Sequence, residues 1–327
     1  MSGSSQDRLE RRTGGRAAAG VGIAGAAAVL LVVCLGIVPR LTEPYRLLMA
    51  ALAVVLLVLA YAWLRVDPHL ARTQEGWTLI RTLRLPDKTR VRVLRQGGVY
   101  QSATYLDERR FDPVFAYQRA FDVLFEAEDA LHAVRGGGVA RVLAIGGGGY
   151  AWPKHALLHH PDLRMDVVEI DGAVTEIARR WFFVDELQRM AGDRLQLVTA
   201  DGRAFIEDAP RAAYDAVVND TFAGSEPVRA LASVEALRAV RACLVPGGLY
   251  LANVVSRDEG EDLTFLRDTV ATCAAMFARV WVVPATDEDL GGEDNYIVIA
   301  SDGDYSFADA VPFDEAFLGT EIHDGSD

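Results

Sequence analysis

Four short glycine and acidic motifs in this chain have the composition of a ligand-binding site. They are Gly146 to Gly149, Glu169 in VVEID, Asp201-Gly202 in TADG, and Asp220 in VVND. Each comes at the end of an apolar run of the kind that forms a buried strand. In an open α/β sheet the carboxyl ends of the parallel strands meet at one edge, and ligands bind outside that edge. The sequence therefore predicts that the four motifs share one site.

The glycine loop and Glu169 together predict a nucleoside site. Glu169 lies 23 residues after Gly146, a separation at which an acidic side chain can hold both ribose hydroxyls. The loop is not a phosphate loop of the GxxxxGK(S/T) type, because Lys154 comes too late and no Ser or Thr follows it. A GxGxxG match has Ala151 at its third position, which dinucleotide folds accept, so this motif leaves a dinucleotide open. Asp201-Gly202, placed where an adenine amino group can be held, favours S-adenosylmethionine instead.

The sequence predicts neither a metal site nor a redox-active cysteine pair. His155 and His159 stand at i and i+4, but the sequence shows no HExxH pattern and no acidic third ligand, so we predict no metal site. Cys34, Cys243 and Cys273 are far apart and lack metal or redox spacing, which predicts free thiols in a reducing compartment.

A repeated strand, loop and helix pattern predicts the sheet that positions these motifs. Between residues 111 and 301, apolar strand-like runs alternate with helical patterns, as in a doubly wound parallel α/β sheet. No helical pattern separates the last two runs, so we expect them to form an antiparallel pair at the sheet edge. The expected strands are 139–145, 162–171, 193–201, 212–220, 249–256, 278–285 and 295–301. The expected helices include 113–134, 233–244 and 262–277.

Two further segments flank this domain. Residues 77–110 alternate apolar and polar side chains with period two and turn at Gln96-Gly97-Gly98, which predicts a small antiparallel β-sheet domain. Residues 302–327 are acidic and weakly patterned, and we expect them to form a loose tail.

Two long apolar segments predict a membrane anchor at the N-terminal end. Residues 17–38 and 47–64 contain no charged side chain, and each is long enough as a helix to cross about 30 Å of hydrocarbon. We predict a two-helix transmembrane hairpin, preceded by a disordered basic tail over 1–16 and followed by a linker over 65–76. A cleaved signal peptide is the alternative. More arginines flank the hairpin than lie in its loop, which predicts a catalytic domain on the cytoplasmic side of the inner or plasma membrane.

The net charge argues against one class of partner. The formal net charge is −13, and eight arginines against four acids in residues 1–72 leave about −17 on the rest of the chain. A catalytic portion this acidic argues against nucleic acid as a partner. It is compatible with a cationic substrate, although such charge commonly serves solubility alone.

Six motifs occur in order over residues 77–300. They are GVYQSATYLD, VLAIGGGGY, VVEID, TADGRAFI, YDAVVNDTF and LVPGGLYLANVV. In these motifs the chain resembles the spermidine synthase family of aminopropyltransferases, which implies a small N-terminal β domain followed by a methyltransferase-like (class I) sheet. The resemblance also implies decarboxylated S-adenosylmethionine as co-substrate, a small-molecule amine as acceptor, and a homodimer. It implies co-substrate contacts from Gln101, Gly146, Gly148, Glu169, Asp201 and Gly202.

The same resemblance implies that Asp220 is the catalytic carboxylate. A protonated amine is no nucleophile, so a carboxylate that binds the cation and accepts its proton serves both needs. Two positions depart from the family pattern: Gly149 stands where the family has Asp, and Ala223 stands where a second Asp usually follows the catalytic one. Both absent acids help to hold a polyamine. Candidates for the substrate side of the site are Tyr117, Tyr150 and Glu226, and then Asp287, Glu288 and Asp289.

Three functions remain open from the sequence. The first is aminopropyl transfer to an amine, and the second is S-adenosylmethionine-dependent methyl transfer on the same fold. The third is a non-catalytic nucleoside-binding module on the membrane, which the two absent acids suggest and the retained Asp220 argues against.

Overall fold

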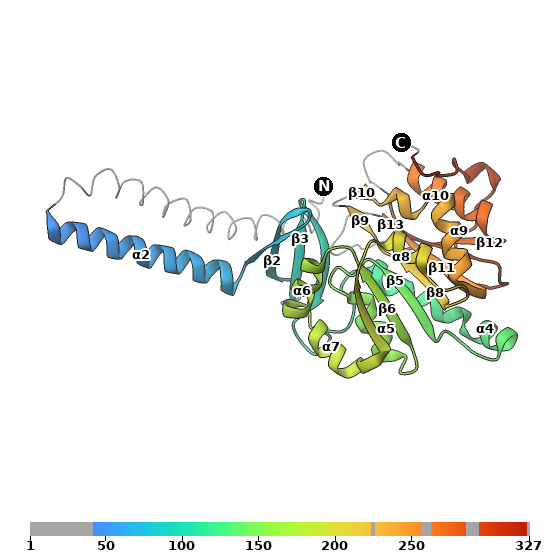
Figure 1. Ribbon diagram of the computed structural model, residues 1–327, viewed down its shortest axis with the longest axis horizontal. Helices are drawn as coiled ribbons and strands as arrows, with labels where there is room; N and C mark the ends of the chain where they lie inside the picture. Colours follow the sequence, from blue (N-terminus) through green and yellow to red (C-terminus); the bar gives the residue numbers. More distant parts are fainter. Residues whose placement is uncertain (1–41, 224–225, 257–262, 286–293, 326–327) are drawn as a thin grey trace.

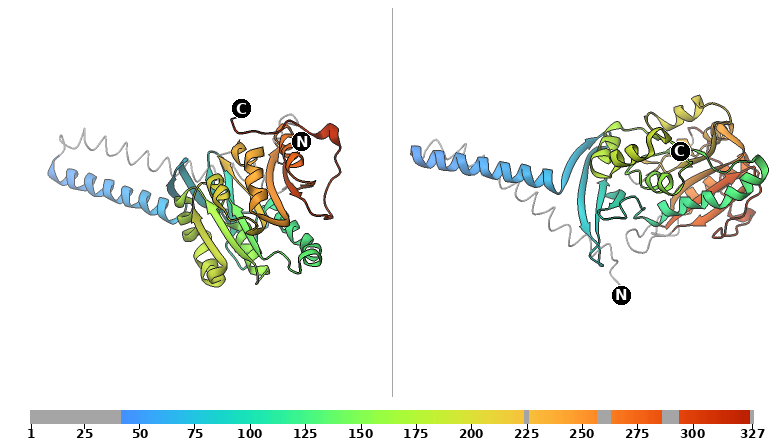
Figure 2. Two further views of the ribbon diagram at one scale, coloured as in Figure 1. Left: turned by 45° about the vertical axis from the view of Figure 1, so that its right-hand side comes forward. Right: turned by 90° about the horizontal axis from the view of Figure 1, so that it is seen from below.

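The computed structural model describes residues 42–223, 226–256, 263–285 and 294–325. Two β-sheets lie next to each other, and helix α2 (Glu43–Val66) projects away from both (Figures 1 and 2). The first apolar segment, 17–38, and the basic tail lie outside the described residues, so the helical hairpin as a whole is not supported. Within the described residues, α2 is the one helix long and apolar enough to cross a membrane.

The small sheet is antiparallel, as the period-two pattern predicts. Its strands follow one another in space in chain order. One face carries a core that includes Leu83, Val91, Val93 and Ala103, because alternate side chains of a strand point to the same face. The strands are β1 (His69–Thr73), β2 (Gly76–Arg84), β3 (Arg90–Gln96) and β4 (Val99–Tyr105).

The linker predicted over 65–76 is wrong in part. Strand β1 lies inside that segment and pairs with β2 along its length. The backbone N–H of Gln74 then donates to the carboxylate of Asp171, next to the end of a strand of the second sheet. The small sheet therefore begins at His69.

The second sheet has seven strands in the order β12-β13-β11-β8-β5-β6-β7. Strand β13 is antiparallel to both β11 and β12, while the other pairs are parallel. The prediction of a doubly wound sheet with an antiparallel edge pair is confirmed. The strands are β5 (Arg141–Ile145), β6 (Arg164–Glu169), β7 (Leu195–Thr199), β8 (Tyr214–Asn219), β11 (Leu244–Ser256), β12 (Arg279–Pro284) and β13 (Asp294–Ser301).

Helices cover both faces of this sheet (Figure 2). Along β5, Val142 and Ala144 join one core and Leu143 and Ile145 join the other, so the strand is apolar on both faces. The helices are α3 (Ala116–Ala120), α4 (Glu128–Arg135), α5 (Ala151–His159), α6 (Gly172–Trp181), α7 (Val184–Ala191), α8 (Gly202–Asp208), α9 (Val234–Cys243) and α10 (Thr264–Met276).

Short elements complete the chain. The helix predicted over 113–134 is divided into α3, a 3₁₀ segment (Phe121–Ala127) and α4, and Gly136 ends it in the left-handed conformation at φ 74°. The described residues include three more 3₁₀ turns. Two short strands, β9 (Phe222–Ala223) and β10 (Glu226–Pro227), pair with each other. The 3₁₀ turns are Gly192–Arg194, Arg229–Leu231 and Glu315–Phe317.

The prediction of a loose C-terminal tail is wrong for its described part, residues 302–325. Phe307 and Ile322 are buried, and the backbone of Ile322 accepts a hydrogen bond from Val234 N–H at the start of α9. Asp324 forms two hydrogen bonds with the Arg203 guanidinium, each of 3.0 Å. The segment has no regular pattern because its contacts are individual anchors rather than one face of a helix or strand.

Candidate active site

A cavity of about 390 Å³ lies at the carboxyl ends of β5, β6 and β8 and is closed on one side by the small sheet. Its volume falls in the range typical of small-molecule sites. The four motifs singled out in the sequence meet here, as the strand-end argument predicts. The predicted residues that line it are Gln101, Tyr117, Gly146, Gly148, Glu169, Asp201, Gly202 and Asp220.

The glycine loop lies against the backbone of Asp220. The amide N–H of Asp220 donates to Ile145 O at 2.9 Å. A Cβ atom on Gly146 would stand 2.2 Å from Asp220 O, and Gly146 has φ +91°. Only glycine satisfies both conditions, so Gly146 fixes the distance between the loop and the candidate catalytic residue.

Glu169 holds the loop in place. Its Oε2 atom accepts hydrogen bonds from the N–H groups of Gly147 and Gly148, at 2.9 and 3.1 Å, and Oε1 accepts one from Asp171 N–H at 3.0 Å. A carboxylate offers about four acceptor positions. If Glu169 binds ribose hydroxyls as expected, it must do so while it also accepts the backbone N–H groups of the loop.

Asp201 and Gly202 form the start of α8. The Asp201 side chain accepts a hydrogen bond from Ala204 N–H at 2.9 Å and caps the helix. A Cβ on Gly202 would stand 2.5 Å from Cγ2 of Ile145, so glycine lets α8 approach β5 closely. Arg203, which also lines the cavity, is held by Glu207 and Asp324.

Asp220 lies at the end of β8 on the cavity wall. Removal from water raises its pKa to about 6, against a hydrogen bond from Asn253 that lowers it. Asn253, on β11, was not singled out in the sequence, although it is an amide within the apolar run LANVV. The parallel register that pairs Ala252 with Asn219 is the signal that places Asn253 beside Asp220.

Gly149 is packed against the small sheet. A Cβ there would stand 2.3 Å from Oγ of Ser102 and 3.0 Å from a ring carbon of Phe182. Ser102 lines the cavity, and its buried hydroxyl has no hydrogen-bond partner among the residues that the structure describes. A side chain at position 149 would therefore collide with the Ser102 hydroxyl, which occupies that space.

Tyr150 does not line the cavity, which corrects its predicted place in the substrate channel. Its side chain is fully buried under the loop, and its hydroxyl hydrogen bonds to that of Thr175 at 2.9 Å. Burial raises the pKa of Tyr150 to about 12. Tyr117 does line the cavity. The side chain of Glu226 and residues 287–289 lie outside the described part of the structure, so their roles stay predictions.

The fold and this edge define a class: a methyltransferase-like α/β protein with a cavity at the strand ends and a small β-sheet in front of it. Residues 130–284 match the family model described as a spermine/spermidine synthase domain. The matched segment, residues 130–284, is thus similar to the spermidine synthase family.

Named relatives include two kinds of transferase. Polyamine aminopropyltransferase 2 of Hyperthermus butylicus is 34% identical over 36% of this chain. Putrescine N-methyltransferase 3 of Nicotiana tabacum is 30% identical over 42% of this chain. The matches span only 38% and 35% of these relatives' own lengths. The crystal structure of a probable spermidine synthase from Corynebacterium glutamicum shares the fold, with a TM-score of 0.62 and 22% identity over 79% of this chain and 97% of that one.

Proposed function

We propose that this chain transfers an aminopropyl group from decarboxylated S-adenosylmethionine to an amine, with Asp220 as the base. The observation that carries the proposal is the position of Asp220: a carboxylate with a pKa raised to about 6 lies in the same cavity as the glycine loop and Glu169. At neutral pH this group is mostly ionised, yet it is a better proton acceptor than an exposed aspartate.

The residues around the cavity fit the co-substrate. Glu169 retains acceptor capacity toward ribose hydroxyls, and Gly148 is open, since a Cβ there would meet nothing nearer than Gln101 O at 3.8 Å. Gln101 and Asp201 stand on the cavity wall as further polar contacts. When bound, the co-substrate supplies an electrophilic carbon on a sulfonium centre.

Asp220 prepares the acceptor. An ammonium group facing Asp220 is held by the carboxylate and gives up its proton to it, which frees the nitrogen lone pair. A new N–C bond then forms as the C–S bond breaks, and the sulfur keeps the electron pair as a neutral thioether. The protein contributes mainly by aligning the two reactants.

We further propose that the acceptor presents one ammonium group to the described part of the site. Three of the lining carboxylates already accept backbone N–H groups: Glu169, Asp171 and Asp201. Asp220 accepts only from the side chain of Asn253 among the contacts described. Aromatic side chains, Tyr117, Phe121 and Trp152, form the wall where the rest of the acceptor would lie.

Methyl transfer to an amine is the second candidate. The similarity to putrescine N-methyltransferase 3 favours it. That match covers 42% of this chain, the same share as the match to spermidine synthase 2 of Arabidopsis thaliana. The same carboxylate would serve this reaction, so only the preferred form of the co-substrate separates the two. A non-catalytic nucleoside-binding module is the third candidate.

We also propose that α2 anchors the protein in a membrane, with the catalytic domain in the cytoplasm. Large apolar side chains stand exposed along the helix, among them Leu47 at 70% and Val54 and Val58 at 59%. Such a surface is costly in water and ordinary in lipid. A homodimer is a further proposal from the family resemblance.

Asp220→Asn tests the assignment of the base. We expect product formation, followed by mass spectrometry with a panel of mono- and diamines, to fall by about 10²-fold or more. Affinity for decarboxylated S-adenosylmethionine, measured by calorimetry, should stay within about threefold, because Asp220 does not hold the nucleoside. An active variant would refute the role of Asp220. If S-adenosylmethionine binds as well as its decarboxylated form and methylated products appear, the methyltransferase hypothesis is correct.

A further inference from the structure

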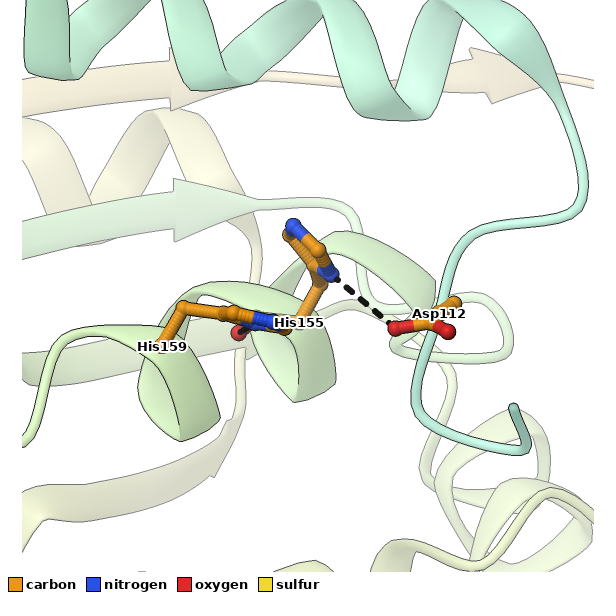
Figure 3. A group of neighbouring side chains, drawn as sticks. All are labelled: Asp112, His155 and His159. Carbon is orange, nitrogen blue, oxygen red and sulfur yellow. Dashed lines mark hydrogen bonds and ion pairs between the residues drawn. The ribbon is translucent and has the colours of Figure 1, made fainter. Parts of the chain in front are cut away.

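A second polar cluster lies outside the residues that line the cavity. His155 and His159 project from α5 one turn apart, and Asp112 comes from the segment between β4 and α3 (Figure 3). One ligand atom from each residue lies within 4.8 Å of the others. The sequence shows the histidine pair, but Asp112 precedes it by more than 40 residues and only the fold brings it near.

The separation of His155 and Asp112 fits two ligands of one ion better than a hydrogen bond. His155 Nδ1 is buried, makes no hydrogen bond within the described residues and lies 3.4 Å from Asp112 Oδ1. Good N–H···O bonds are about 2.7–3.2 Å long. Two ligand atoms about 2.1 Å from a tetrahedral zinc ion lie about 3.4 Å apart.

In each histidine, the ring nitrogen that would not bind the ion already has a hydrogen-bond acceptor, as is usual for metal-bound histidines. His155 Nε2 lies 2.9 Å from Asp122 Oδ2, so Nε2–H donates a hydrogen bond to the carboxylate, and in this tautomer the lone pair is on Nδ1. His159 Nδ1 lies 2.9 Å from the carbonyl oxygen of His155. A carbonyl only accepts, so this proton stays on Nδ1 and the lone pair is on Nε2. Metal-bound histidines characteristically donate their other N–H to a carboxylate or a backbone carbonyl.

We propose that Asp112, His155 and His159 form a site for a divalent transition-metal ion of the zinc type. Two imidazoles and a carboxylate are the ligands that zinc accepts. The Asp112 side chain is 43% exposed and His159 is exposed as well, so solvent can reach the site and supply a fourth ligand.

The site is connected to the cavity by Asp122. Trp152 Nε1–H donates to Asp122 Oδ1 at 2.9 Å, and Trp152 lines the cavity. An ion bound to His155 would therefore fix Asp122 and, through it, one aromatic wall of the acceptor region. The role that follows is structural, because Asp220 comes directly after β8 and makes no contact with the cluster in the described residues.

Zinc binding to the full-length protein in detergent tests this site. We expect calorimetry with ZnCl₂ to show saturable binding of one ion per chain, and Co²⁺ to develop the visible absorption of a tetrahedral site. His159→Gln and Asp112→Asn each remove one ligand and should weaken binding by at least about tenfold, and Asp122→Asn by about 10- to 100-fold. His132→Gln is the matched control, since it removes an exposed histidine from α4 and should leave binding unchanged.

The readouts do not depend on activity. Zinc should raise the unfolding temperature of the wild type and of His132→Gln but not of His159→Gln, because an ion bound only to the folded state stabilises it. His159 is exposed, so its replacement should not prevent folding. Absence of saturable zinc binding, or equal affinity in the wild type and His159→Gln, would refute the site.

Discussion

Asn253 Nδ2 donates a hydrogen bond of 2.9 Å to Oδ1 of Asp220, across the boundary between β11 and β8. The two side chains come from parts of the chain 33 residues apart. The neutral amide stabilises the ionised carboxylate without supplying a charge that would compete with a cationic acceptor. It thereby limits the rise in pKa that desolvation causes at Asp220.

Removal of this donor should shift the acidic limb of the pH profile. Asn253→Ala removes a hydrogen bond to the charged form, so the pKa of Asp220 should rise above about 6. A bond to a charged group is worth about 1.5 kcal/mol, which corresponds to about one pH unit. The pH dependence of kcat/KM measures this shift. An acidic limb at the wild-type position would mean that a different group is the base.

Asp220 should cost the protein stability at neutral pH. Its pKa is about 6 in the folded state and 3.8 unperturbed. Because the folded pKa is the higher one, the associated stability is present below about pH 4 and is lost as the pH rises through about 6. Asp220→Asn should therefore unfold at a higher urea concentration than the wild type at about pH 8. Its free energy of unfolding should be larger by at most about 3 kcal/mol. Near pH 3.5 the difference should vanish. A variant less stable than the wild type at pH 8 would contradict the desolvation of this carboxylate.

Gly149→Asp should fail to restore an acidic contact. Its Cβ would overlap Ser102 Oγ and press on Phe182, and overpacking of this kind costs about 1–3 kcal/mol. Ser102→Gly combined with Gly149→Asp should recover part of that loss in thermal unfolding. Gly137→Asp is the control, because a Cβ at that position meets nothing within 4 Å. Equal stability of Gly149→Asp and Gly137→Asp would show that the loop moves freely.

Lys154 should make stability rise with pH. Its amine is fully buried and donates to Thr104 Oγ1 and to the carbonyl oxygens of Arg110 and Phe182. Desolvation lowers its pKa from 10.5 to about 7. The lowered pKa means that stability is gained as the pH rises from about 7 toward 10.5 and is lost as it falls through about 7.

Lys154→Met should flatten that dependence. Urea unfolding at about pH 7 and about pH 9.5 measures it, with Lys88→Met as the exposed control that keeps the wild-type slope. A wild-type slope in Lys154→Met would place the titrating group elsewhere.

Deletion of residues 1–66 should give a water-soluble protein that binds the nucleoside, because the cut removes α2 and leaves β1 intact. Deletion of 1–75 also removes β1 and the bond from Gln74 N–H to Asp171. It should lower the unfolding temperature and weaken binding. Gel filtration without detergent and calorimetry compare the two proteins. Aggregation of the shorter deletion would mean that α2 is part of the folded core.

The sequence was most informative where one local pattern determines the structure. The seven strands have continuous apolar runs, and the motifs at their ends could be placed on one edge by topology alone. The role of Glu169 toward the loop could not be predicted, because it depends on which way two backbone N–H groups point. Tyr150 was misplaced for a similar reason: its left-handed backbone, φ 55°, turns the ring under the loop.

Contacts between distant segments could not be predicted from the periodicity of the sequence. Ser102 beside Gly149, Asn253 beside Asp220, and Asp112 beside His155 each join residues that no periodicity links. The contacts of Phe307, Ile322 and Asp324 could not be predicted either. They are single contacts without a periodic pattern, so the sequence of this segment looks like that of a disordered tail.

The cavity has walls from two sheets, and this has a thermodynamic consequence. Ser102 and Gln101 come from the small sheet and the glycine loop from the large one, while the Lys154 amine bonds to Thr104 across the same boundary. The small sheet cannot separate from the large one without opening the cavity and exposing a buried amine. The two units should therefore melt as one cooperative transition, and ligand binding should raise the melting temperature of both together.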